Sequence, residues 1–177
     1  ASLRERYGVT GCVIAAVDLI FGIGIAAGLE PVRIKGATGL PDTNYEGKAQ
    51  AGLDALRRGL DLVYLHVEAM DEMGHAGDFR RKVSALEDFD AKVVGAYVDA
   101  ACNEFHEGMR IAVLPDHPTP IALRTHTREP VPVVVYDSRW DSQCLRDRGF
   151  DECAARKGEL GLFPSGPAFA DYFFSDE

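Results

Sequence analysis

The sequence has no run of basic residues, no C-x-x-C pair and no uninterrupted apolar stretch long enough to span a membrane. Its 177 residues include 28 acidic side chains against 19 Lys and Arg, a formal net charge of −9. Because proteins that follow nucleic-acid phosphates need clustered Lys and Arg, we do not expect a nucleic-acid partner. A phosphorylated small molecule would be repelled by this acidic protein unless the electrostatic potential at its site were positive, which bound metal ions can provide.

The number of cysteines alone decides little, because a secreted chain of this length could also fold without disulfides, and we expect reduced thiols in a cytoplasmic protein. The four are Cys12, Cys102, Cys144 and Cys153. The apolar stretch at 8–28 is interrupted by Asp18 and diluted by glycines, and neither a basic segment nor a small-residue cleavage site frames it. We therefore expect a strand followed by a helix there, with no membrane association.

A chain of this length with 46% hydrophobic residues fits one domain with a sizeable core, 1–177. Apolar runs alternate with helical patterns, which predicts an α/β fold with a mainly parallel sheet and helices on both faces. Expected strands cover 11–16, 31–34, 61–67, 109–114 and 131–136. Expected helices cover 17–29, a segment from Asp42 or Thr43 to Gly59, 78–105 and about 169–174, with 68–77 as a loop and 137–157 as a polar excursion.

Side chains that carry chemistry follow the predicted strands, where ligand sites of open α/β sheets gather. Asp71 and His75 are four positions apart, so they share one face of a helix and can also converge in a tight loop. A carboxylate with an imidazole suits Mn²⁺ or Zn²⁺. Taken alone, such a pair more often forms a simple carboxylate–histidine hydrogen bond.

Asp116 and His117 follow the fourth predicted strand, and His126 precedes the fifth. At a strand end that turns into a Pro-flanked loop, the adjacent pair can face one cavity or two metals, although Asp is also common in ordinary turns. Together with Asp71 and His75, these residues predict a site for two metals. His66 is expected in a strand, where it would make a buried hydrogen bond or contact a residue that binds the metal. His106 is expected to be exposed.

Three segments resemble archaeal-type cofactor-independent phosphoglycerate mutases, which belong to the alkaline phosphatase superfamily. They are GATGLPDTNYEGKAQAGLDAL, HVEAMDEMGHAGDFRRKVSALEDFD and PDHPTPIALRTHTREPVPVVVY, in that order. The resemblance runs from about Tyr7 to the C-terminus. It implies an alkaline-phosphatase-like core, of which this chain resembles the C-terminal half.

The resemblance also implies a set of metal ligands. Asp71, His75 and His126 would hold one ion, and Asp116 and His117 the second. The family's other ligands of the second ion are a strand-end Asp and the nucleophilic Ser or Thr, which we expect upstream of this chain together with the cap domain. No catalytic nucleophile is therefore expected within it.

The family's reaction interconverts 2-phosphoglycerate and 3-phosphoglycerate, a glycolytic step, through a phosphoserine intermediate and two divalent ions. We expect Mn²⁺ or Zn²⁺, since imidazole ligands disfavour Mg²⁺. Two alternatives stay open from the sequence. One is another phosphatase or phosphomutase of the superfamily, and the other is a non-catalytic metal-binding domain. The chain alone is expected to be inactive.

Overall fold

A computed structural model describes residues 1–140 and 149–175 of the protein. The described residues form two compact units. The first comprises Ala1–Ala100 with Thr119–His126, and the second comprises Ala101–Pro118 with the residues from Thr127 onward.

The first unit contains a three-stranded parallel sheet with the strand order β2-β1-β3. Strand β1 (Gly11–Ile14) pairs with β3 (Leu62–Leu65) from Gly11 opposite Leu62 to Ile14 opposite Leu65. The short strand β2 (Glu30–Pro31) pairs with the other side of β1. Because the pairing is parallel, β1 and β3 end at the same edge of the sheet. This edge is where the site begins.

Helices cover both faces of this sheet, as predicted. Side chains of β1 alternate between two clusters: Val13 packs with Phe21 of α2 (Asp18–Ala26), whereas Cys12 and Ile14 pack with Ala55 of α3 (Tyr45–Arg57). Since successive side chains of a strand point to opposite faces, α2 and α3 lie on opposite faces. The predicted α/β class is confirmed for this unit.

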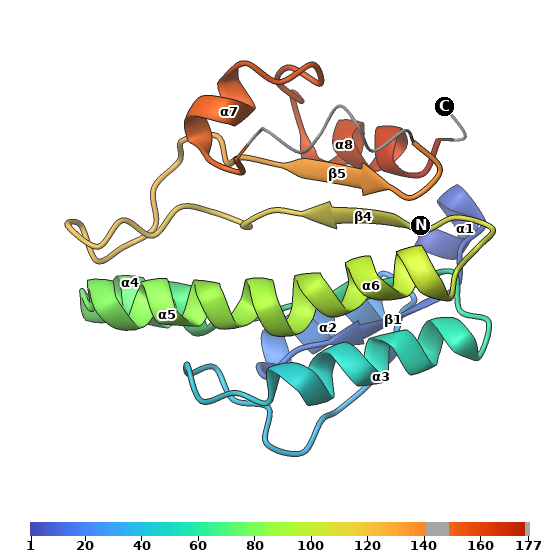
Figure 1. Ribbon diagram of the computed structural model, residues 1–177, viewed down its shortest axis with the longest axis horizontal. Coiled ribbons are helices and arrows are strands. Elements are labelled where there is room, and N and C mark those ends of the chain that lie inside the picture. Colours follow the sequence, from blue (N-terminus) through green and yellow to red (C-terminus); the bar gives the residue numbers. More distant parts are fainter. Residues whose placement is uncertain (141–148, 176–177) are drawn as a thin grey trace. The chain divides into compact units, whose positions relative to one another are not determined.

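A long helical rod follows the sheet and packs on α3. It consists of α5 (Phe79–Phe89), a π-helical turn η1 (Asp90–Val94) and α6 (Gly95–Asn103), which Figure 1 shows as one continuous ribbon. Val93 packs with Tyr45 and Ala49 of α3. The predicted helix over 78–105 is thus present, with one widened turn. A short helix α1 (Leu3–Tyr7), which the sequence analysis did not anticipate, begins at a capping box on Ser2.

The cap of helix α3 lies one residue after Thr43 and two after Asp42, the two predicted caps. The side chain of Asn44 accepts a hydrogen bond from Gly47 N, so Asn44 is the cap rather than Asp42 or Thr43. Thr43 instead accepts a hydrogen bond from Thr38 N within the preceding turn. Gly59 follows the helix with a positive φ of 94°, as expected of a residue that stops a helix.

The second unit is built on an antiparallel pair of strands, β4 (Arg110–Val113) and β5 (Val134–Asp137). The mainly parallel arrangement therefore does not extend to this pair. Parallel neighbours need a long crossover, usually a helix, and no helix was predicted between these strands. The unit also contains α7 (Glu152–Arg156) and α8 (Gly166–Phe173), the latter capped by Ser165.

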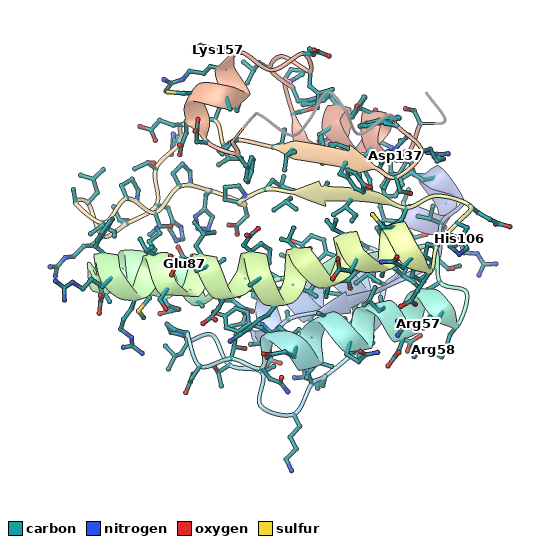
Figure 2. The ribbon with its side chains drawn as sticks, viewed as in Figure 1. Arg57, Arg58, Glu87, His106, Asp137 and Lys157 are labelled. Atoms are coloured by element: carbon teal, nitrogen blue, oxygen red, sulfur yellow. The ribbon has the colours of Figure 1, made fainter. Side chains whose placement is uncertain are left out.

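A buried ion pair joins the two strands of the second unit. Asp137, labelled in Figure 2, is fully buried and accepts a hydrogen bond from Arg110 Nε at 3.0 Å and others from Arg139. Arg110 Nη1 also donates to the carbonyl oxygens of Phe173 and Ser175, both at 2.8 Å. The hydrogen bonds from Arg139, followed by the one from Arg110, hold the pKa of the Asp137 carboxyl well below its usual range. This pair ties α8 to the strands.

Among the described residues, none of the helices has both the length and the apolar character needed to cross a membrane. Cys12, Cys102 and Cys153 are free thiols, as predicted. Cys144 lies outside the described residues.

Candidate metal centre

Asp71 and His75 lie on a helix, α4 (Ala69–Ala76), that begins directly after β3. The expectation of a loop over 68–77 is therefore wrong. The helix ends at Gly77, which adopts a left-handed conformation with φ 73°. Only glycine adopts this conformation freely, so Gly77 marks the end of a helix instead of indicating a loop. On α4 the two side chains share one face, and His75 Nε2 lies 3.4 Å from Asp71 Oδ2.

His126 comes from a different part of the chain and completes a cluster with this pair. Its Nε2 lies 3.0 Å from His75 Nε2 and 3.3 Å from Asp71 Oδ1, although 51 positions separate the two histidines. The two imidazole rings are tilted by 52° with centroids 4.8 Å apart. The predicted clustering of these three residues is confirmed, whereas their role as ligands stays a prediction.

The three side chains fit a divalent metal ion. A tetrahedral ion with bonds of about 2.0–2.1 Å holds its ligand atoms about 3.3–3.4 Å apart. The two Nε2 atoms lie 3.0 Å apart, Asp71 Oδ1 lies 3.3 Å from His126 Nε2, and Asp71 Oδ2 lies 3.4 Å from His75 Nε2, so each separation is close to these values. All three side chains remain partly exposed, with relative exposures between 32% and 49%, so an ion and a substrate oxygen could reach them.

The hydrogen bond on the far side of the His75 ring determines which nitrogen is available to a metal. His75 Nδ1 lies 3.0 Å from the carbonyl oxygen of Arg124. A carbonyl oxygen only accepts, so Nδ1 carries the hydrogen and, in the neutral ring, Nε2 keeps its lone pair. This lone pair belongs to the nitrogen that faces Asp71 and His126. Metal-binding histidines commonly have such a carbonyl partner.

The backbone of Arg124 adopts a conformation that is uncommon for a residue with a side chain. Its φ is 52°, the only positive φ of a non-glycine residue in the described part of the chain. The guanidinium lies against Gly77, where an added Cβ would approach Arg124 Nε to 2.5 Å. Gly77 thus both ends α4 and leaves space for Arg124, whose carbonyl orients His75.

A buried ion pair lies where β1 and β3 end, beside the start of α4. Lys48 of α3 is completely buried and donates to Glu68 Oε2 at 3.2 Å and to the carbonyl oxygen of His66 at 3.0 Å. Glu68 Oε1 accepts from the backbone N–H groups of Ala16 and Val17, at 2.9 and 3.3 Å. Burial lowers the pKa of Lys48, and the nearby Glu68 carboxylate opposes that shift. This pair connects α3, the end of β1 and the residue that precedes α4.

Asp116 and His117 follow β4 in the second unit. His117 Nε2 lies 3.3 Å from Asp116 Oδ2, and the backbone N–H of His117 donates to Asp116 Oδ1 at 3.0 Å. The two adjacent side chains therefore turn toward each other and present an imidazole and a carboxylate together. They also line a groove of about 450 Å³ formed by residues of the second unit.

Of the other two histidines, His106 is exposed as predicted, whereas His66 lies after its strand and is only partly buried, so the expected buried hydrogen bond within a strand is wrong. His66 follows β3 and stacks on Tyr64, whose hydroxyl lies 3.5 Å from His66 Nδ1. His106 is exposed beyond the end of α6 (Figure 2). Sequence reasoning did not identify Lys48, Glu68, Lys82, Thr119 and Arg124, which support the candidate ligands. The one signal for Lys48 was its place beside Ala49 on the apolar face of α3.

Comparisons with known proteins show which family the chain resembles. The profile of the metalloenzyme superfamily matches residues 1–164. The 2,3-bisphosphoglycerate-independent phosphoglycerate mutase of Methanosarcina barkeri is 50% identical over 160 residues, which are 90% of this chain and 39% of that protein. A probable enzyme of the same name from Geobacter sulfurreducens is 51% identical with the same coverage, and that of Methanopyrus kandleri is 37% identical.

A solved structure has a similar fold. The PH0037 protein from Pyrococcus horikoshii superposes with a TM-score of 0.79 at 28% identity, over 90% of this chain and 46% of that one. The chain thus spans about two fifths of the length of the curated relatives it matches. Fold and superfamily together fit the alkaline-phosphatase-like core expected from the sequence. Since the superfamily profile covers most of the chain, this protein belongs to the metalloenzyme superfamily.

Proposed function

We propose that this chain forms the metal-binding part of a cofactor-independent phosphoglycerate mutase that interconverts 2-phosphoglycerate and 3-phosphoglycerate. One observation carries the proposal: two imidazole nitrogens lie 3.0 Å apart, and each lies 3.3–3.4 Å from one of the two oxygens of the Asp71 carboxylate. The relatives that are about 50% identical over 90% of the chain bear the name of this enzyme, which supports the choice of substrate. A cytoplasmic location is part of the same proposal.

Asp71, His75 and His126 would hold one divalent ion, Mn²⁺ or Zn²⁺, and Asp116 and His117 would contribute to a second. When bound, such ions neutralise phosphate charge and lower the pKa of an attacking hydroxyl. His75 presents its unprotonated Nε2 because Arg124 accepts the hydrogen on Nδ1. With a net charge of −9, the chain itself offers little attraction to a phosphorylated substrate, so the ions would provide it.

The nucleophile that carries the phosphoryl group is proposed to lie outside this chain. Thr119 offers a hydroxyl beside Asp71, but it is 5% exposed and donates its hydrogen to the Asp71 carboxylate. A hydroxyl in this position is blocked from attacking a substrate. The ligand sets are then unequal, with three ligands for the first ion and two for the second.

Calorimetric titration with Mn²⁺ or Zn²⁺ at neutral pH tests the metal assignment. We expect one tight site, abolished by His75→Ala or His126→Ala, and a weak or undetectable second site that depends on His117. Two equally tight sites, or a tight site that survives His126→Ala, would contradict the assignment. His106→Ala is the matched control, because this exposed histidine is not a proposed ligand.

Incubation of the purified chain with 3-phosphoglycerate and Mn²⁺ tests the proposed location of the nucleophile. We expect no 2-phosphoglycerate above the background of a metal-free control. Turnover would show that the nucleophile is inside these 177 residues.

A further inference from the structure

We propose that Thr119 is a positioning residue for the metal centre, whose hydroxyl holds Asp71 in the orientation that binds the ion. The inference rests on the proposed function, since it concerns the ligand Asp71. Thr119 lies two residues after His117 in the sequence and was not among the ligands expected from it. Its hydroxyl donates to the carboxylate of Asp71, so it would act on the ion through that ligand.

The hydrogen bond from Thr119 is made to one of the two carboxylate oxygens of Asp71. Thr119 Oγ1 donates to Asp71 Oδ1. An ionised carboxylate only accepts, so the hydroxyl must be the donor. With Oδ1 engaged by this bond, Oδ2, which faces His75 Nε2 at 3.4 Å, is the oxygen favoured to bind the ion. The arrangement therefore favours coordination through one oxygen.

Thr119 is itself held from its backbone. Lys82 of α5 donates from Nζ to the carbonyl oxygen of Thr119 at 2.7 Å. Thr119 is 5% exposed, so water has little access with which to replace either hydrogen bond. Burial lowers the pKa of Lys82, and the Asp71 carboxylate opposes that shift. These two hydrogen bonds, from Lys82 to Thr119 and from Thr119 to Asp71, link α5 to the face of α4 that carries the proposed ligands.

Gly74 makes this close approach possible. An added Cβ at Gly74 would lie 2.6 Å from the Thr119 carbonyl oxygen, 2.9 Å from its Cγ2 and 3.0 Å from Lys82 Nζ. A glycine inside a helix ordinarily weakens the helix, so its presence in the middle of α4 needs a reason. The approach of Thr119 supplies that reason.

Thr119→Val tests the inference, because Val keeps the shape of the side chain and removes the hydroxyl. Groups that orient metal ligands typically contribute about 10–100-fold to metal affinity. We expect a loss of this size for Co²⁺ or Zn²⁺, measured by competition with a chromophoric chelator. We also expect an altered visible spectrum of bound Co²⁺. Thr119→Ser, which restores a donor, should recover most of both properties.

Thr43→Val is the matched control for general destabilisation. Thr43 is equally buried, at 4% exposed, and its hydroxyl accepts a hydrogen bond from Thr38 N at a turn before α3. This variant should lose stability without a change in Co²⁺ affinity or spectrum. Equal losses of affinity in Thr43→Val and Thr119→Val would reduce Thr119 to a structural role and overturn the inference, as would Thr119→Ser binding no better than Thr119→Val.

His75→Ala separates this inference from the proposed function. If His75→Ala abolishes tight Co²⁺ binding while Thr119→Val binds as the wild type does, the metal site is correct and the role of Thr119 is wrong. If His75→Ala binds as tightly as the wild type, the metal site itself is wrong, and the inference falls with it.

Discussion

Replacing Lys48 with Met would remove one partner of the buried ion pair and leave the packing largely intact. The Lys48 side chain is 0% exposed and that of Glu68 is 8% exposed, so the carboxylate would lose its cation without gaining water. Met has a similar unbranched shape and fills the space of the lysine methylenes. The carbonyl oxygen of His66 would lose its donor as well.

The expected cost follows from the partners that remain. Removing one partner of a buried ion pair typically costs about 3–5 kcal/mol. Glu68 would keep two hydrogen bonds, from the N–H groups of Ala16 and Val17, which places the cost toward the lower end of that range. We therefore expect Lys48→Met to lower the free energy of unfolding by about 3 kcal/mol. The double variant Lys48→Met/Glu68→Gln should recover most of this loss, because no uncompensated charge stays buried.

Urea unfolding followed by circular dichroism, in buffer with a chelator, measures these differences without a contribution from bound metal. Gln50→Met, at an exposed position of the same helix, is the control and should change stability by at most about 0.5 kcal/mol. The reasoning is refuted if Lys48→Met unfolds as the wild type does, or if the double variant is less stable than Lys48→Met.

Three further predictions concern other parts of the molecule. Gly74→Ala should weaken Co²⁺ binding by about tenfold or more in the chelator competition, because the added Cβ would displace Thr119. Gly95→Ala is the control and should leave binding unchanged, because its Cβ would meet only Asp90 O at 3.5 Å. Asp137→Asn should lower the free energy of unfolding by about 2–4 kcal/mol at neutral pH. The pKa of Asp137 is lowered in the folded protein, so the stability contributed by its carboxylate is present above the ordinary pKa of about 3.9 and is lost progressively as the pH falls below that value. Urea unfolding curves of variant and wild type should therefore converge in acid and differ at neutral pH. Saturating Mn²⁺ or Zn²⁺ at about 100 times the dissociation constant should stabilise the wild type by about 2.7 kcal/mol in thermal unfolding, and EDTA or His75→Ala should remove that gain.

Much of the candidate site follows from the sequence because its spacing has direct geometric consequences. Asp71 and His75 are one helical turn apart, and His126 was expected near them because ligand sites gather at the carboxyl edge of a sheet. The sequence predicts a loop in place of α4 because Gly74 and Gly77 are both typical turn residues. One of them ends the helix, and the other leaves room for a neighbouring segment, which only the tertiary structure reveals.

The supporting residues could not be predicted for a different physical reason. A buried lysine is stable only with a partner, and Glu68 lies 20 positions away from Lys48 on another element. No local pattern links the two. The antiparallel pairing of β4 and β5, in contrast, was within reach of the sequence, because the segment between the two strands contains no helical pattern that could return the chain for a parallel neighbour.

The central claim is that Asp71, His75 and His126 bind one divalent ion, and anomalous diffraction from crystals grown with Mn²⁺ tests it most directly. We expect an anomalous peak within about 2–2.3 Å of Nε2 of both histidines and of a carboxylate oxygen of Asp71. Crystals of His126→Ala grown in the same way should show a much weaker peak or none. A strong Mn²⁺ peak elsewhere, with the three side chains still hydrogen-bonded to one another, would contradict the account.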